Sequence, residues 1–111
     1  MDCIFCKIAN GEIPTNMVYQ DEQVAAFNDL NPQAPAHILI VPGKHVENAA
    51  ECVEKLPGTL EHMVAVASTL AKTHCPEGYR LIMNTGAKAG QTVFHFHMHV
   101  LGGTQLSDHM A

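Results

Sequence analysis

The chain has 111 residues, of which 47% are apolar and 15% charged, which is enough for one domain (1–111) with a small core. A formal net charge of −5, with six Lys and Arg residues and no basic run, argues against a nucleic-acid partner. No apolar stretch approaches the roughly 18–20 residues that cross a bilayer, and the start of the chain lacks the features of a secretory signal. We therefore expect a cytoplasmic protein with no membrane partner, whose four cysteines are thiols or ligands.

Local patterns predict the following elements in chain order. Residues 3–9 form a short apolar helix, and residues 17–20 and 24–28 form two strands around a turn. Residues 36–41 are β-branched and almost wholly apolar, as in a central strand covered on both faces. Apolar residues at helical spacing predict one long amphipathic helix over about 59–74. Two further strands, at 79–84 and 92–101, complete an α+β fold with an antiparallel sheet of about five strands.

The last predicted strand carries three histidines, His95, His97 and His99, that alternate with apolar residues. Because strand side chains repeat with a period of two, the imidazoles share one face and the apolar residues pack beneath the long helix. One interpretation is an ordinary solvated strand face, although such faces rarely repeat a single residue type. The other two are a zinc ion bound by imidazoles and an imidazole nucleophile, which is largely neutral at pH 7.

The residues before the histidines favour the nucleophile. Gly86 and Gly90, followed by Gln91 and Thr92, place backbone N–H groups and side-chain donors beside the histidines. Such donors suit the non-bridging oxygens of a phosphate. The glycine spacing is not that of a Walker loop, since no Gly-Lys-Ser/Thr follows. The pattern therefore predicts attack on a phosphorus atom outside the P-loop class.

Residues 90–103, GQTVFHFHMHVLGG, resemble the signature of the histidine triad (HIT) superfamily. The Leu-Gly-Gly that ends this segment and the upstream residues 29–37, DLNPQAPAH, are similar to the Hint-like branch. The resemblance extends from residue 4 to about residue 105. It implies the HIT-like fold, with one long helix, a short N-terminal helix and a sheet of about five strands, and it implies a homodimer.

The resemblance also implies an activity, the hydrolysis of purine nucleoside phosphoramidates such as AMP-NH2, AMP-lysine-like and aminoacyl-adenylate-like compounds. His97 would form a nucleotidyl-histidine intermediate whose hydrolysis releases the nucleoside monophosphate. His99 would contact the α-phosphate or the leaving group, and His95 would steady the array. His37 matches a fourth histidine that supports proton transfer. No cofactor is implied for catalysis.

The nucleotide-binding residues are also implied by the resemblance. Asp29 stands where the family binds the ribose hydroxyls, although it could equally cap the turn at Asn31 and Pro32. The polar positions near the phosphate correspond to Asn84, Gly90, Gln91 and Thr92. The apolar walls around the purine correspond to Ile4, Phe5, Ile8, Ile13, Phe27 and Leu30, some of which are core residues in any case.

Two departures from the family pattern bear on substrate. The third triad position is His99 rather than the glutamine of nucleotidyl-transferring relatives, which disfavours transfer to a sugar phosphate. The segment after Gly103 has neither a tryptophan nor paired prolines, so the resemblance does not predict the leaving group.

Cys3 and Cys6 have the spacing of half a zinc site or of a redox pair. No strand precedes them, which argues against a thioredoxin-like role, and two incidental cysteines are the remaining alternative. Some HIT proteins bind structural zinc through such a pair, and the resemblance supplies His45 and His95 as the other two ligands. A Cys₂His₂ site is closed and structural.

Three other functions stay open. A zinc hydrolase built on the three histidines would need metal for turnover. A dinucleoside polyphosphate hydrolase of the same superfamily would cleave Ap3A or Ap4A. A nucleotide-binding or interaction protein with a vestigial triad would bind AMP without turnover.

Overall fold

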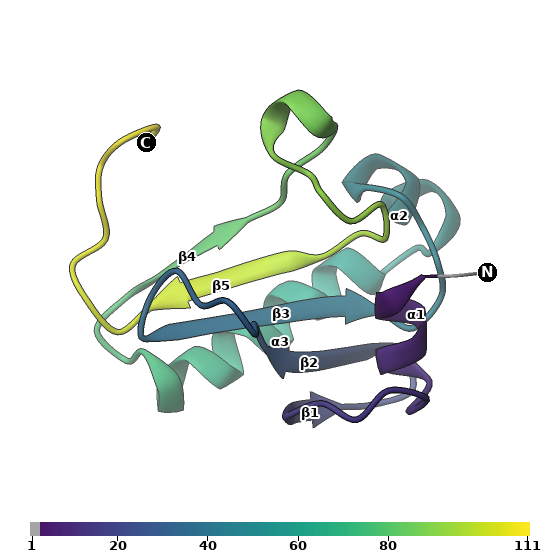
Figure 1. Ribbon diagram of the computed structural model, residues 1–111, viewed down its shortest axis with the longest axis horizontal. Coiled ribbons are helices and arrows are strands. Elements are labelled where there is room, and N and C mark those ends of the chain that lie inside the picture. Colours follow the sequence, from purple (N-terminus) through teal and green to yellow (C-terminus); the bar gives the residue numbers. More distant parts are fainter. Residues whose placement is uncertain (1–2) are drawn as a thin grey trace.

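The computed structural model describes residues 3–111, which form one open antiparallel sheet with helices on both faces (Figure 1). The five strands lie in the order β1-β2-β3-β5-β4. The α+β class and the five-stranded antiparallel sheet predicted from the sequence are confirmed. The strand bounds are Met17–Gln20 (β1), Val24–Asn28 (β2), Ala36–Pro42 (β3), Tyr79–Ile82 (β4) and Met98–Gly102 (β5).

The central strand β3 is buried on both faces, as its apolar run predicts. Ile38 and Ile40 face the helix α3, while Leu39 and Val41 face the short helix α1. The helix bounds are Ile4–Ala9 (α1), Ala49–Lys55 (α2) and Thr59–His74 (α3), with a 3-10 turn at Ala87–Ala89. None of the helices in the described chain is long and apolar enough to span a membrane.

The face that carries α3 holds the larger core. Buried residues of α3 pack against apolar side chains of β2, β3 and β5, and against Phe96 just before β5. The members of this core on α3 and β5 are Met63, Val66, Ala67, Ala71, Met98 and Val100. The predicted contact between the apolar residues of the histidine segment and the long helix is therefore present.

On the opposite face, α1 lies over β2 and β3 at one end of the sheet (Figure 1). Phe5 and Ile8 of α1 pack with Phe27 of β2 and Leu39 of β3. The remainder of this face, toward β5 and β4, has no helix over it among residues 3–111. This uncovered part of the sheet carries His99, whose side chain is half-buried.

The last strand is shorter than the sequence predicts, because the expected strand 92–101 begins only at Met98. The β3–β5 ladder pairs Ile40 with Met98, and two residues further Pro42 would stand opposite Phe96. Proline has no N–H to donate to a ladder. The Phe96 N–H instead donates to the carbonyl oxygen of Val46 over 2.7 Å. His95 and His97 therefore lie on irregular backbone just before the strand.

The structure differs from the sequence-based prediction at two further points. Phe94, expected on the apolar face of the strand, lies before its start and is 44% exposed. The helix α2 was not predicted from the sequence. It begins after Asn48, whose side chain accepts a hydrogen bond from the Glu51 N–H. Cys52 is the one buried residue of α2, so the sequence of this helix shows little of the apolar spacing that marks α3.

The close approach of β5 to the end of α3 gives a test of the packing. A Cβ atom on Gly102 would lie 2.5 Å from Cys75 Cβ and 2.8 Å from Gly78 O, closer than side chains pack. We expect Gly102→Ala to lower the free energy of unfolding by about 1–3 kcal/mol, measured by urea denaturation, because overpacking of this kind forces backbone shifts.

The matched control is Gly43→Ala, whose Cβ would lie 3.7 Å from Gln23 O, an ordinary contact. We expect this variant to stay within about 0.5 kcal/mol of the wild type. Equal stabilities for the two variants would contradict the packing described here.

Candidate active site

His97 lies immediately before β5 with its ring nearly buried. Its Nδ1 is 2.9 Å from the carbonyl oxygen of His95. A carbonyl oxygen only accepts hydrogen bonds, so the proton of the neutral ring is on Nδ1 and the lone pair is on Nε2. The ring also contacts Phe5 edge-on, with centroids 5.0 Å apart. This arrangement holds His97 in the tautomer that a nucleophile needs.

The Nε2 atom of His97 has no hydrogen-bond partner among residues 3–111. No fully buried side-chain nitrogen or oxygen in that part of the chain lacks a partner. The Nε2 atom is therefore accessible from outside the protein, despite the low exposure of the ring as a whole.

A second hydrogen-bonded chain runs beside His97 through His37 and His99. The Gln33 N–H donates to His37 Nδ1 over 3.0 Å, so the proton of the neutral His37 ring is on Nε2. His37 Nε2 is 2.9 Å from His99 Nδ1 and 3.3 Å from Asp29 Oδ2. His37 thus donates to His99, which leaves the remaining proton of His99 on its Nε2.

The local environment keeps both of these imidazoles neutral. Burial and, to a smaller extent, repulsion from His97 and His37 lower the pKa of His99 to about 4, against an opposing effect of Asp29. Burial also lowers the pKa of His37, again opposed by Asp29. Both rings are therefore uncharged near pH 7, as the hydrogen bond between them requires.

The loop before the triad corrects one expectation. Gln91 was expected near the phosphate, but its side chain is buried and its amide N–H groups donate to the carbonyl oxygens of Glu47 and Val93. Its Oε1 accepts the Gly86 N–H. Because both donors are engaged, Gln91 holds the loop in place and has none left for a ligand.

Asn84, Gly90 and Thr92 lie on the same loop and are more open. The side chains of Asn84 and Thr92 make no hydrogen bonds within residues 3–111, and Thr92 is exposed. Gly90 has a φ of 98°, a left-handed conformation that favours glycine, and the Asn84 amide lies beside it. The side chains of Asn84 and Thr92 are therefore free to donate hydrogen bonds to an anionic ligand.

The residues expected around the purine fall into two groups. Phe5, Ile8 and Phe27 are buried in the core beneath α1, with the rings of Phe5 and Phe27 edge-to-face at 5.6 Å, and Ile13 packs against that core. Ile4 and Leu30 are 49% and 90% exposed. Only the second group presents a large apolar surface to solvent.

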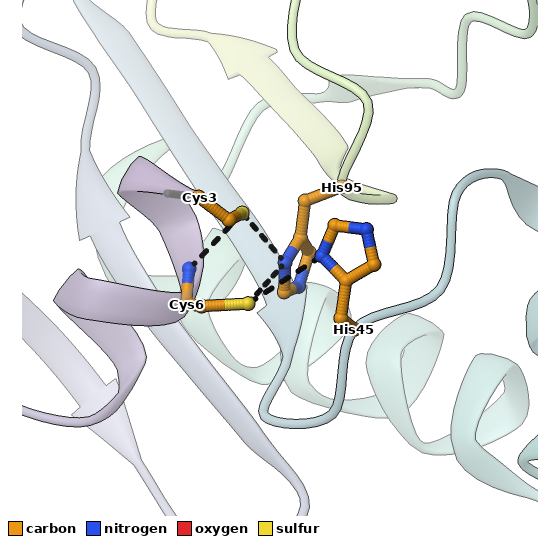
Figure 2. A group of neighbouring side chains, drawn as sticks. All are labelled: Cys3, Cys6, His45 and His95. Carbon is orange, nitrogen blue, oxygen red and sulfur yellow. Dashed lines mark hydrogen bonds between the residues drawn. The ribbon is translucent and has the colours of Figure 1, made fainter. Parts of the chain in front are cut away.

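Cys3, Cys6, His45 and His95 come together from α1, the loop after β3 and the segment before β5, and we call them the Cys/His cluster (Figure 2). Their four ligand atoms lie within 4.8 Å of one another. The Sγ atoms of Cys3 and Cys6 are each 3.3 Å from His95 Nδ1, and Cys6 Sγ is 3.4 Å from His45 Nδ1. The predicted ligand set is thus assembled in space.

The donor set of the Cys/His cluster fits zinc. With Zn–S near 2.3 Å and Zn–N near 2.0 Å, a tetrahedral ion separates sulfur and nitrogen ligands by about 3.5 Å. His95 Nε2–H donates to the Pro42 carbonyl oxygen over 2.9 Å, which leaves the Nδ1 lone pair directed at the thiols. Metal-binding histidines generally donate their second N–H to such an acceptor.

Asp29, His37 and His99 also bring three ligand atoms within 4.8 Å of one another, but they fit a metal poorly. The Gln33 N–H occupies His37 Nδ1, so His37 Nε2 carries a proton and offers no lone pair. The Gln33 N–H therefore makes this group of residues suited to hydrogen bonding and not to metal binding.

Three backbone groups of this site were not predicted from the sequence. They are the carbonyl oxygens of His95 and Pro42 and the N–H of Gln33, each of which fixes a histidine tautomer. Every residue has such groups, so no residue type marks them in a sequence.

The depressed pKa of His99 predicts a pH-dependent stability. An unfolded histidine takes up a proton near its ordinary pKa of 6.5, whereas folded His99 does so only near 4. Between these values the unfolded chain binds more protons, so stability falls as the pH is lowered through this window. We expect His99→Gln to lose less stability than the wild type between about pH 7 and about pH 5, measured by urea denaturation.

The control is His109→Gln, at an exposed position after β5 and outside any helix, which should lose as much stability on acidification as the wild type. If the stability of His99→Gln falls on acidification as much as that of the control, the pKa of His99 does not cause the pH dependence of stability.

Comparison with known proteins agrees with this geometry. A family model described as "Scavenger mRNA decapping enzyme C-term binding" matches residues 2–110. The chain is 44% identical to the purine nucleoside phosphoramidase of Escherichia coli K12, over 99% of this chain and 94% of that protein. A histidine triad protein from Clostridium difficile matches with a TM-score of 0.91 and 48% identity, covering 97% of this chain and 96% of the other. A HIT family hydrolase from Clostridium thermocellum matches with a TM-score of 0.92 and 42% identity, covering 99% and 97%. The chain is therefore a member of the histidine triad (HIT) family.

Proposed function

We propose that the protein hydrolyses purine nucleoside phosphoramidates through a nucleotidyl intermediate on His97. The observation that carries this proposal is the hydrogen bond from His97 Nδ1–H to the His95 carbonyl oxygen, which leaves the accessible Nε2 with its lone pair. The name of the Escherichia coli relative, purine nucleoside phosphoramidase, supports this substrate class.

In the first step, His97 Nε2 attacks the α-phosphorus and the P–N bond of the substrate breaks. The electron pair of that bond leaves with the nitrogen, which takes a proton from solvent and departs as an amine. The His97 ring keeps its Nδ1 proton and becomes cationic. The His95 carbonyl oxygen already accepts that proton's hydrogen bond, and a charged donor strengthens it.

In the second step, water attacks the same phosphorus and His97 leaves with the electron pair of the P–N bond. The water releases one proton to solvent, which balances the proton taken up earlier, and the nucleoside monophosphate is formed. Splitting the displacement in two gives each step a good leaving group.

The other polar residues have roles that follow from their contacts. His37 occupies His99 Nδ1, so His99 Nε2–H is a donor for a phosphate oxygen or for the leaving nitrogen. The free side chains of Asn84 and Thr92 supply further donors to the phosphate. Asp29 accepts the Asn31 N–H on Oδ1, which leaves Oδ2 to accept a ribose hydroxyl in competition with His37.

We place the purine against the exposed side chains of Ile4 and Leu30, with the buried Phe5 and Phe27 beneath them as core. A homodimer is also part of the proposal. It is supported by β4, an edge strand whose outer side has no partner strand in the described chain, and by the exposed Tyr79 and Met83.

The decisive test is release of AMP from adenosine 5′-phosphoramidate by the protein as purified, with no metal ion added to the assay. We expect turnover by the wild type and a loss of about a thousandfold or more in His97→Ala, because that variant lacks the attacking nitrogen. His74→Ala, at an exposed position of α3, should keep full activity.

Three outcomes would contradict the proposal. Turnover retained by His97→Ala would mean that another group attacks. AMP binding without turnover by the wild type would indicate a binding protein. Faster cleavage of Ap4A than of the phosphoramidate would favour the dinucleoside polyphosphate alternative.

We further propose that the Cys/His cluster binds structural zinc. Two thiolates side by side need a cation, since burial and the neighbouring Cys3 raise the pKa of Cys6 to about 11 in the protein alone. We expect elemental analysis to find about one zinc per chain in the wild type and almost none in Cys3→Ser/Cys6→Ser.

Cys52→Ala is the control, because Cys52 is buried in the core on the other face of the sheet and should leave the zinc content unchanged. A wild type without zinc after expression in zinc-supplemented medium would refute this assignment.

A further inference from the structure

His95 connects the Cys/His cluster to the nucleophile through the two ends of one residue. Its ring Nδ1 faces the sulfur atoms of Cys3 and Cys6, and its Nε2–H donates to the Pro42 carbonyl oxygen. Its own carbonyl oxygen accepts the His97 Nδ1–H. The residue is fully buried, so the ring and the carbonyl group cannot turn independently without disturbing the core.

The backbone around His95 makes few hydrogen bonds of its own. Because β5 begins at Met98, the ladder with β3 does not hold the segment 93–97. In this segment, as far as the structure describes it, the one backbone N–H that donates to another backbone group outside the strands is that of Phe96. The direction of the His95 carbonyl group is therefore restrained from two sides, by the Phe96 hydrogen bond, since that N–H shares a peptide plane with the His95 carbonyl, and by the ring contacts of His95.

The helix α1 contacts both His95 and His97. It carries Cys6, with Cys3 as its N-cap residue, and it also carries Phe5, whose ring meets the rings of His97 and His95 edge-on at 5.0 and 6.1 Å. His45, on the loop after β3, completes the cluster from the other side. One short helix is thus fastened to the segment that positions the nucleophile.

We infer that Cys3, Cys6 and His45 are positioning residues for the reaction, because by holding the His95 ring they keep its carbonyl oxygen on His97 Nδ1. When this restraint is lost, the His97 proton is free to move to Nε2, and the ring then has no lone pair to offer to phosphorus. The inference rests on the proposed function and goes beyond a role of the cluster in stability alone.

A purely structural cluster predicts a different result. Its removal would lower the melting temperature and leave the tautomer of His97 and the turnover of the folded enzyme unchanged. A positioning role predicts a loss of kcat that exceeds any change in KM. Some change in KM is expected in a cysteine pair variant, because Ile4, which we place against the purine, lies on α1 between the two cysteines. The tautomer also gives a signature that does not depend on activity, in the 15N chemical shifts of the His97 ring.

The experiment compares the wild type with Cys3→Ser/Cys6→Ser, His45→Ala and the control Cys52→Ala, each below its melting temperature. We expect the cysteine pair variant to lose about tenfold or more in kcat, the effect typical of losing groups behind a site, and to show His97 Nε2 partly protonated. His45→Ala should change in the same direction by a smaller factor. Cys52→Ala should melt earlier and keep the wild-type kcat and 15N shifts.

Unchanged 15N shifts and kcat in the folded cysteine pair variant would overturn the inference. If that variant does not fold, His45→Ala decides the question, because His45 is exposed and its truncation leaves the buried contacts of α1 in place. A wild type without turnover would refute the proposed function, and the His97 15N shifts would still decide whether the cluster sets the tautomer.

Discussion

The arrangement of the site depends on one hydrogen bond, from His97 Nδ1–H to the carbonyl oxygen of the residue two places before it. An isolated neutral imidazole exchanges between two tautomers, and only one of them presents its lone pair at Nε2. A backbone acceptor keeps the ring in this tautomer as long as the hydrogen bond is made, because a carbonyl oxygen never donates. Main-chain groups fix two more histidine tautomers. The Pro42 carbonyl oxygen accepts the His95 Nε2–H, and the Gln33 N–H donates to His37 Nδ1. Three histidines are thus given three fixed protonation patterns by main-chain groups.

The two faces of the sheet differ in what they carry, since one holds most of the apolar core and the other holds the polar residues of the candidate site. The α3 face holds the larger apolar core, including Met98 and Val100 from the strand that follows His97. The other face is covered by α1 over β2 and β3 and carries His37 and His99 beyond that cover. Because strand side chains alternate, one strand serves both faces without conflict.

The sequence was a good guide where a pattern depends on burial. The apolar run of β3 and the helical spacing of α3 gave nearly the observed bounds, because both elements contact the core along their whole length. The strand over 92–101 was predicted too long, since the cause of its late start is Pro42 on the neighbouring strand, a contact that no local pattern contains. The short helix α2 escaped notice because it buries little beyond Cys52.

The same contrast holds for the site. The histidine spacing and the cysteine pair are side-chain signals, and the residues that they indicated do lie together in space. Gln91 shows the limit of this approach, because its residue type suits a phosphate while its neighbours consume both of its donors. Whether a polar side chain is free depends on what surrounds it, and the surroundings come from distant parts of the chain.

The shortness of α1 has a consequence for the order in which the protein takes shape. A helix of six residues is far below the roughly 12–15 that are marginally stable in water, so it forms only against partners. Its partners His45 and His95 lie 39 and 89 residues after Cys6. The helix therefore lacks these contacts until the segment that carries His95 is in place. The arrangement beside His97 is thus completed by contacts between parts of the chain that are far apart in the sequence.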